Sequence, residues 1–183
     1  ATAGSDRPLR ILVATHNLNF EGAPWFIFEL ACHLAAQPGV SVRVVSPADG
    51  PLRRAFAELG LTPQVLPLAP AFAARSRAEF DAALRAAGAG IAWDEVDLVI
   101  ANTMVCFWAV HLARAAGKPA LLYVHESTPV RRFFAPMLDP ALFPLVEEAF
   151  RDAARVVYTA DSTRLVHETL DPGNGVLLPS WVD

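Results

Sequence analysis

Short apolar runs alternate with helical patterns along nearly the whole chain, and this alternation constrains the fold more than any other feature. Seven runs have the length and the Val, Ile and Leu content of strands buried on both faces. They lie at 9–15, 41–46, 63–67, 98–101, 120–125, 155–159 and 175–178. Strands that are regularly followed by helices indicate a parallel sheet with helices on both sides. We therefore expect an α/β fold with about seven parallel strands.

The segments between these runs have helical periodicity. In the first, Ile27, Leu30, Ala31 and Leu34 repeat at the spacing of one helix face. Pro24 is expected at the first helical position, where its missing N–H would have no partner in any case. Further helices are predicted at about 51–59, 77–87, 105–116, 145–152 and 161–170.

Right-handed crossovers make a Rossmann-like, doubly wound sheet with the order 3-2-1-4-5-6-7 the expected topology. The 183 residues are enough for one hydrophobic core, and a hydrophobic content of 54% excludes a disordered chain. We expect a single domain over 9–183, preceded by a flexible N-terminal segment at 1–8.

Charge and apolar length exclude two further classes. The net charge is −4 and Lys and Arg form no block, so no nucleic-acid partner is expected. No uninterrupted apolar stretch reaches 18 residues, so no transmembrane helix is predicted.

Cys32 and Cys106 both lie in apolar helical patterns, which favours buried free thiols and a reducing, cytoplasmic compartment.

The stretch 129–144 is expected to be irregular, and it contains Arg131, Arg132, Phe133 and Phe134. These four residues have the mixed basic and aromatic character of a surface that touches a membrane. Two charges are too few to hold a membrane alone, so a loop that covers the site is the favoured interpretation. Peripheral contact with the inner face of a membrane stays the alternative.

The expected topology also selects a site. The first and fourth strands are neighbours at the point where the strand order reverses, and ligands bind beyond the carboxyl ends of strands there. The first strand ends at Thr15-His16-Asn17, the fourth at Ala101-Asn102-Thr103 and the fifth at Tyr123-Val124-His125-Glu126. These three polar clusters are expected to converge on one crevice.

His125 is the sharpest single candidate, because an imidazole at a strand end can act as a general base on a hydroxyl. The strand-end position equally allows a histidine that bonds to backbone and closes the loop. Glu126 could orient a sugar hydroxyl or cap the next turn, and its spacing favours the cap. His16 is expected in a loop. The remaining histidines, His33, His111 and His167, lie in helical patterns and are expected to face solvent or stack on neighbours.

Gly22 precedes the first helix, where the absence of a Cβ and the free N–H groups of the helix would suit a phosphate. An ordinary strand-to-helix turn explains a single glycine as well. No G-x-G-x-x-G follows the first strand, no phosphate-binding G-x-x-x-x-G-K-[ST] occurs, and Ser162 lacks a G-x-S-x-G context. No His, Cys, Asp or Glu pair has metal-ligand spacing, so no metal is expected.

Five segments together resemble retaining glycosyltransferases of family 4, which have the GT-B fold. They are NLNFEGAP at 17–24, DLVIANT at 97–103, LLYVHE at 121–126, ARVVYTADST at 154–163 and LPSWVD at 178–183. Two departures stand out. Glu21 replaces the more frequent first glycine of the loop, and Ser180-Trp181 replaces the usual Asn-Gly pair before Val-Asp.

The resemblance implies the N-terminal, acceptor-side half of a GT-B enzyme. Such an enzyme would transfer a hexose from a nucleotide-sugar to a glycan, lipid or other hydroxyl acceptor with retention, without a metal or other cofactor. In this family a second domain with a Glu-x7-Glu segment makes most donor contacts, and it would follow Asp183. The chain by itself is therefore expected to be inactive, with that C-terminal domain as its partner.

The resemblance also assigns roles. His125, the candidate catalytic residue, would touch the donor sugar or the acceptor, and Gly22 and Ala23 would offer N–H groups to the diphosphate. The acceptor side would be lined by Asn19, Asn102, Thr103 and Glu126. One alternative is a non-catalytic Rossmann-like binding module. Another is the first half of a GT-B sugar-nucleotide epimerase, whose hydrolytic carboxylates should lie near strand ends, where Glu126 is the one candidate.

Overall fold

The structure, a computed structural model, describes residues 7–179. Residues 1–6 and 180–183 lie outside it, and with them most of the expected N-terminal segment and the Ser180-Trp181 departure. The strands are β1 (Leu9–Ala14), β2 (Val40–Ser46), β3 (Gln64–Val65), β4 (Leu98–Asn102), β5 (Ala120–Val124), β6 (Arg155–Tyr158) and β7 (Gly175–Leu177). All pairings are parallel, in the order β3-β2-β1-β4-β5-β6-β7. The predicted seven-stranded, doubly wound sheet is confirmed.

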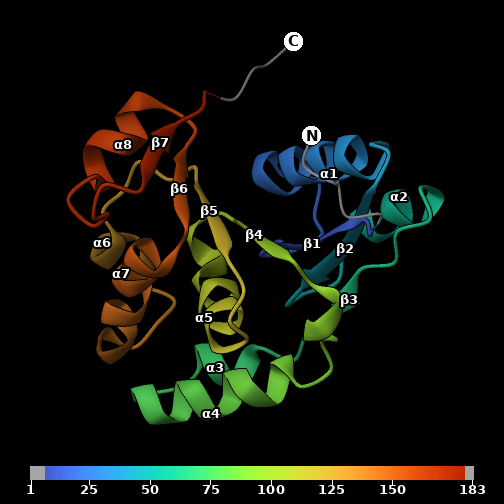
Figure 1. Cartoon of the computed structure of the whole chain (residues 1–183). Helices are drawn as coiled ribbons and strands as arrows, with labels where there is room; N and C mark the ends of the chain where they lie inside the picture. Colours follow the sequence, from blue (N-terminus) through green and yellow to red (C-terminus); the bar gives the residue numbers. More distant parts are fainter. Residues whose placement is uncertain (1–6, 180–183) are drawn as a thin grey trace.

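Helices cover both faces of this sheet (Figure 1). They are α1 (Gly22–Ala35), α2 (Leu52–Glu58), α3 (Ala69–Phe72), α4 (Arg77–Gly88), α5 (Phe107–Ala115), α6 (Val130–Phe134), α7 (Phe143–Asp152) and α8 (Asp161–His167). Alternate residues of one strand feed two different cores, as the pleat requires. Ile11 and Val13 of β1 pack with α1 and α2, whereas Leu12 and Ala14 pack with α3, α4, α5 and α7.

The strand register brings the polar strand ends to one edge. Ala14 is paired with Ala101, and Asn102 is paired with Tyr123. The residues that follow β1, the last residue of β4 and the residues that follow β5 therefore lie close together, at the N-terminal end of α1.

The helix start at 22–24 differs from the prediction. α1 begins at Gly22 with Glu21 as its N-cap, so Pro24 is the third helical residue and not the first. The position is still permitted, because the N–H groups of the first turn have no partner within a helix. The error is two residues, and it places Gly22 and Ala23 inside the first turn.

The stretch 129–144 is more regular than expected. It contains the short helix α6 and a 3-10 turn, η3 (Pro140–Leu142). Phe134 is buried against Phe107, with ring centroids 5.8 Å apart, and Arg131 pairs with Glu147 at 3.2 Å. Phe134 is thus part of the core and adds nothing to an exposed patch. Among the described residues no helix combines the length and apolarity that crossing a membrane demands.

Candidate functional site

A cleft of about 520 Å³ lies at the carboxyl ends of β1, β4 and β5. It is lined by His16, Asn17, Glu21, Gly22, Ala23, Pro24, Thr103, Val105, His125, Glu126, Phe133 and Met137. All three strand-end clusters selected from the sequence contribute to this lining or to the layer directly behind it. Five of the seven predicted site residues are in the lining, and Asn102 and Asn19 are not.

Asn102 is fully buried and joins two walls of the cleft. Its Nδ2 donates to the backbone oxygen of Ala23 at 2.8 Å, and its Oδ1 lies 2.9 Å from Nε2 of His125. Because the amide nitrogen is used on Ala23, the oxygen faces the imidazole and can only accept. Nε2 of His125 therefore carries the proton, and the lone pair of the ring is on Nδ1.

The ring of His125 is half-buried among aromatic side chains. It lies edge-on to Phe26, with ring centroids 5.1 Å apart, and roughly parallel to Tyr123 at 6.5 Å. Burial, and to a smaller extent the neighbouring His16, lowers the pKa of His125 from 6.5 to about 4. A neutral imidazole with this pKa is a weak base at neutral pH and a good hydrogen-bond acceptor at Nδ1.

The structure bears differently on the two alternatives for His125. Its recorded partner is a side chain, Asn102, so the ring is not tied to the backbone. Its lowered pKa disfavours proton abstraction near neutral pH.

Glu126 turns its carboxylate inward. Oε2 accepts from the backbone N–H of His125 at 3.1 Å and from that of Met104 at 3.3 Å. Burial raises the pKa of this carboxyl. The side chain thus caps the turn η2 (Met104–Cys106) after β4, which agrees with the capping interpretation, although the capped turn belongs to the neighbouring strand.

Thr103 has an unusual backbone. Its φ is 76° and its ψ is 155°, and it is the one non-glycine residue with positive φ in the part of the chain described. Its Oγ1 accepts from the N–H of Val105 at 3.2 Å. Such a conformation stores about 1–3 kcal/mol of strain for a residue with a Cβ, and strain of this kind gathers at functional sites.

The loop before α1 is organised by Glu21. Its carboxylate accepts from Nδ2 of Asn17 and Nδ2 of Asn19, each at 3.2 Å, and lies 3.7 Å from Nε2 of His16. Hydrogen bonds from the two asparagines lower the pKa of Glu21, whereas burial lowers that of His16. Asn19 thus positions Glu21 and is not in the cleft lining.

No side chain caps α1, so the backbone N–H groups of Gly22 and Ala23, which line the cleft, are left to donate hydrogen bonds to a ligand. A Cβ on Gly22 would meet no atom within 4 Å. The glycine is therefore not required by packing, and its small size leaves the first turn of α1 open to a ligand.

His167 was missed by sequence reasoning. It is fully buried in α8 and not on the surface, although it does stack on Phe150, with centroids 5.4 Å apart. Its Nε2 bonds to the backbone oxygen of Glu126 at 2.8 Å and so holds the turn after β5. A weak signal existed, because His167 and the buried Thr163 are four residues apart on one helix face.

Two properties of the cleft limit its chemistry. Within residues 7–179 no three His, Cys, Asp or Glu side chains gather as a metal group. Neither lysine nor arginine is among the described residues that line the cleft. Any ligand here meets carboxylates, neutral imidazoles, amides and backbone N–H groups.

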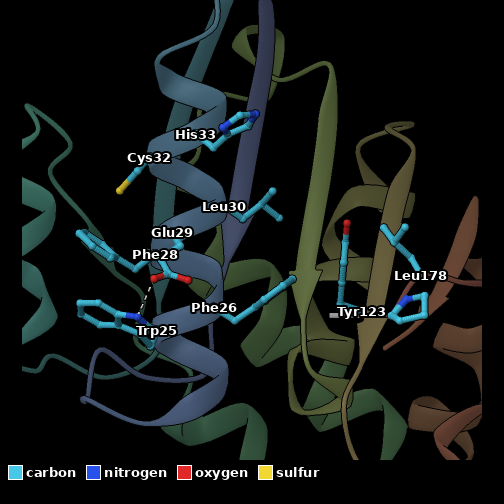
Figure 2. Close-up of a pocket in the computed structure, with 10 residues that line it drawn as sticks. Trp25, Phe26, Phe28, Glu29, Leu30, Cys32, His33, Tyr123 and Leu178 are labelled. Carbon is cyan, nitrogen blue, oxygen red and sulfur yellow. Dashed lines mark hydrogen bonds between the residues drawn. The ribbon is translucent and has the colours of Figure 1, made fainter. Parts of the chain in front are cut away.

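A second, more apolar groove of about 820 Å³ runs along α1 (Figure 2). Phe26 and Leu30 of α1 point toward Tyr123 and Leu178, whereas Trp25 and Phe28, which also line it, lie on the other side of the helix. Phe26 and Tyr123 are the same rings that enclose His125. The groove therefore adjoins the cleft, but the convergent polar groups are in the cleft.

The model of the family described as Glycosyltransferase Family 4 matches residues 20–183. No curated protein sequence matches the chain.

Solved structures show the same fold at low identity. Anabaena Alr3699/HepE in complex with UDP and glucose has a TM-score of 0.68 and 16% identity, over 96% of this chain and 45% of that one. Phytolacca americana UGT2 with UDP-2fluoro-glucose and pterostilbene has a TM-score of 0.55 and 16% identity, over 93% and 52%. The UDP-GlcNAc 2-epimerase from Neisseria meningitidis, bound to UDP-GlcNAc, has a TM-score of 0.57 and 12% identity, over 92% and 45%. The chain spans about half the length of these proteins.

Proposed function

The chain belongs to glycosyltransferase family 4, and from this premise we propose that it forms the acceptor-side half of a GT-B glycosyltransferase. The complete enzyme would transfer a hexose from a nucleotide-sugar to a hydroxyl of a glycan, lipid or other acceptor, with retention and without a metal. Structures with this fold were solved with UDP-glucose and with UDP-2fluoro-glucose, which supports a nucleotide-sugar donor.

The linked group of Ala23, Asn102 and His125 carries this proposal. Asn102 fixes the Nε2–H tautomer of His125 and ties the start of α1 to the end of β4. Nδ1 of His125 would then accept a hydrogen bond from a sugar hydroxyl at the switch point of the sheet. Held in this way, a sugar is oriented without a proton transfer to the imidazole, and orientation alone can contribute several kcal/mol to catalysis.

The remaining predicted residues have supporting roles. The N–H groups of Gly22 and Ala23 would bind the donor diphosphate at the positive end of α1. Thr103 would contact the acceptor from the floor of the cleft, and Glu126 would hold His125 in place through its backbone N–H. A second domain of the same polypeptide would complete the donor site.

The test is turnover by the full-length protein with a panel of UDP-sugars and hydroxyl acceptors. His125→Ala is expected to lower kcat/KM about 100-fold, which corresponds to about 3 kcal/mol of transition-state stabilisation. His33→Ala, an exposed histidine on α1, is the matched control and should leave kcat/KM unchanged. Residues 1–183 alone should give no turnover. Full activity of the His125→Ala protein would contradict the assigned role.

An epimerase half is the second candidate, because 2-epimerases of UDP-N-acetylglucosamine share the fold. Glu126 argues against this candidate. An epimerase half should have hydrolytic carboxylates near strand ends, and the one carboxylate at the end of β4 or β5 is already bound to two backbone N–H groups. Incubation with UDP-GlcNAc separates the two functions. Release of the 2-epimer without an acceptor would favour the epimerase, whereas sugar transfer that depends on an acceptor would favour the transferase. Ligand binding with neither product would indicate a non-catalytic module.

A further inference from the structure

The cleft carries negative charge and no positive side chain among its described lining residues. Glu21 and Glu126 are the two carboxylates, and the lowered pKa values of His16 and His125 leave both imidazoles neutral near pH 7. Glu126 is engaged by backbone N–H groups below the surface. Glu21 is exposed whereas Glu126 is half-buried, so Glu21 is the more accessible carboxylate of this lining.

Glu21 is also held in place. One oxygen accepts from Asn17 and the other from Asn19, so neither oxygen rotates freely. An ionised carboxylate has about four lone-pair positions, and these two bonds leave about two for other donors. Oε2 also lies 3.7 Å from Nε2 of His16, so Oε1 is the oxygen with more room for a further hydroxyl donor.

This arrangement changes what the start of α1 would attract. Uncapped N–H groups at a helix N-terminus favour anions, and the Gly22 and Ala23 donors would do so here. A carboxylate one residue earlier places a fixed negative charge at the same end. The carboxylate of Glu21 thus offers hydrogen-bond acceptors to hydroxyl groups. Its negative charge also opposes the binding of any anion in addition to the donor diphosphate.

We propose that Glu21 is a specificity-determining residue that makes the acceptor side of the cleft select uncharged polyhydroxyl acceptors over phosphorylated ones. This inference rests on the proposed glycosyltransferase function. Specificity arises in two ways: the neutral acceptor gains hydrogen bonds to the carboxylate, and the anionic acceptor is repelled. Two charges a few ångströms apart at a partly exposed site repel by enough to change affinity about tenfold or more.

The experiment compares binding of glucose 6-phosphate and glucose by the full-length protein, measured by calorimetry or by NMR titration. The variants are Glu21→Gln, which removes the charge and keeps the size, and Glu58→Gln as control. Glu58 is an exposed carboxylate on α2 outside the cleft, so the control makes the same change in net charge. Thermal unfolding of each variant verifies that it is folded.

We expect Glu21→Gln to bind glucose 6-phosphate about tenfold more tightly than the unchanged protein, and Glu58→Gln to bind it equally. The gain should shrink at high salt. Glucose affinity should stay the same or fall slightly in Glu21→Gln. Equal affinity of the unchanged and Glu21→Gln proteins for glucose 6-phosphate, including no measurable binding by either, would overturn the inference. So would an equal gain in Glu58→Gln.

The binding measurement tests the role of Glu21 independently of the transferase activity. Absence of sugar transfer with every donor would overturn the transferase proposal but would leave the measured selectivity of the cleft intact. Conversely, an active transferase whose Glu21→Gln variant uses glucose and glucose 6-phosphate in the same ratio as before would retain the proposed function and lose the inference.

Discussion

The half-buried imidazole of His125 should make the protein sensitive to mild acid. In the folded protein its pKa is lowered from 6.5 to about 4, mainly by burial. The unfolded chain therefore binds a proton at higher pH than the folded one, and acidification favours unfolding. From these two values, lowering the pH from about 7.5 to about 5 removes about 2 kcal/mol of stability, and about 3 kcal/mol is lost by about pH 4.

Comparison with His125→Gln isolates this contribution, because His16, His111 and His167 also have lowered pKa values and respond to acid in both proteins. The free energy of unfolding is measured by urea denaturation with tryptophan fluorescence at a series of pH values. The stability of the unchanged protein relative to His125→Gln should fall by about 2 kcal/mol between about pH 7.5 and about pH 5.

The control is His33→Gln, since His33 is exposed on α1. This variant carries the same His-to-Gln change outside the cleft, and its unfolding is measured over the same pH range. A difference between unchanged protein and His125→Gln that is constant would refute the reasoning, because it would mean that His125 titrates alike in the folded and unfolded chains.

Three further changes test other parts of the site. Asn102→Ala should lower the free energy of unfolding by about 2–4 kcal/mol, because it leaves a buried carbonyl and an imidazole N–H without partners; urea denaturation measures this, and a loss below about 1 kcal/mol would contradict it. Gly22→Val should weaken donor binding about tenfold by calorimetry but leave the melting temperature nearly unchanged, since a Cβ there meets no atom within 4 Å. Cys106 is buried, and burial raises the pKa of its thiol, so a thiol reagent should modify Cys32 first and Cys106 only after unfolding.

The sheet could be predicted from the sequence because each strand is a continuous apolar run and each crossover has one favoured hand. The location of the cleft follows from the strand order alone. The exact first and last residues of the helices were harder to predict. Pro24, for example, is compatible with several positions in the first turn of α1. The short helix α6 could not be predicted, because the prolines around it indicate an irregular segment. Phe134 at its end is buried by contact with Phe107 of α5, which the local sequence does not show.

The roles of the site residues were harder to predict because they depend on partners far along the chain. Asn102 bonds to Ala23, which is 79 residues away, and this pairing fixes the tautomer of His125. His167 reaches Glu126 across 41 residues. The spacing in the sequence favoured a cap for Glu126, and only the fold shows that the capped turn follows the neighbouring strand β4. No periodicity in the sequence records such contacts.

The backbone of Thr103 has a consequence for anyone who evolves this protein for heat resistance. A glycine adopts a φ of 76° without a Cβ penalty, so a library screened for survival after heating is expected to enrich Thr103→Gly, even though the Oγ1 contact with Val105 is lost. The most heat-resistant clones would then carry an altered cleft wall and a looser turn after β4. Selection for heat resistance would favour glycine at position 103, whereas selection for turnover would favour threonine.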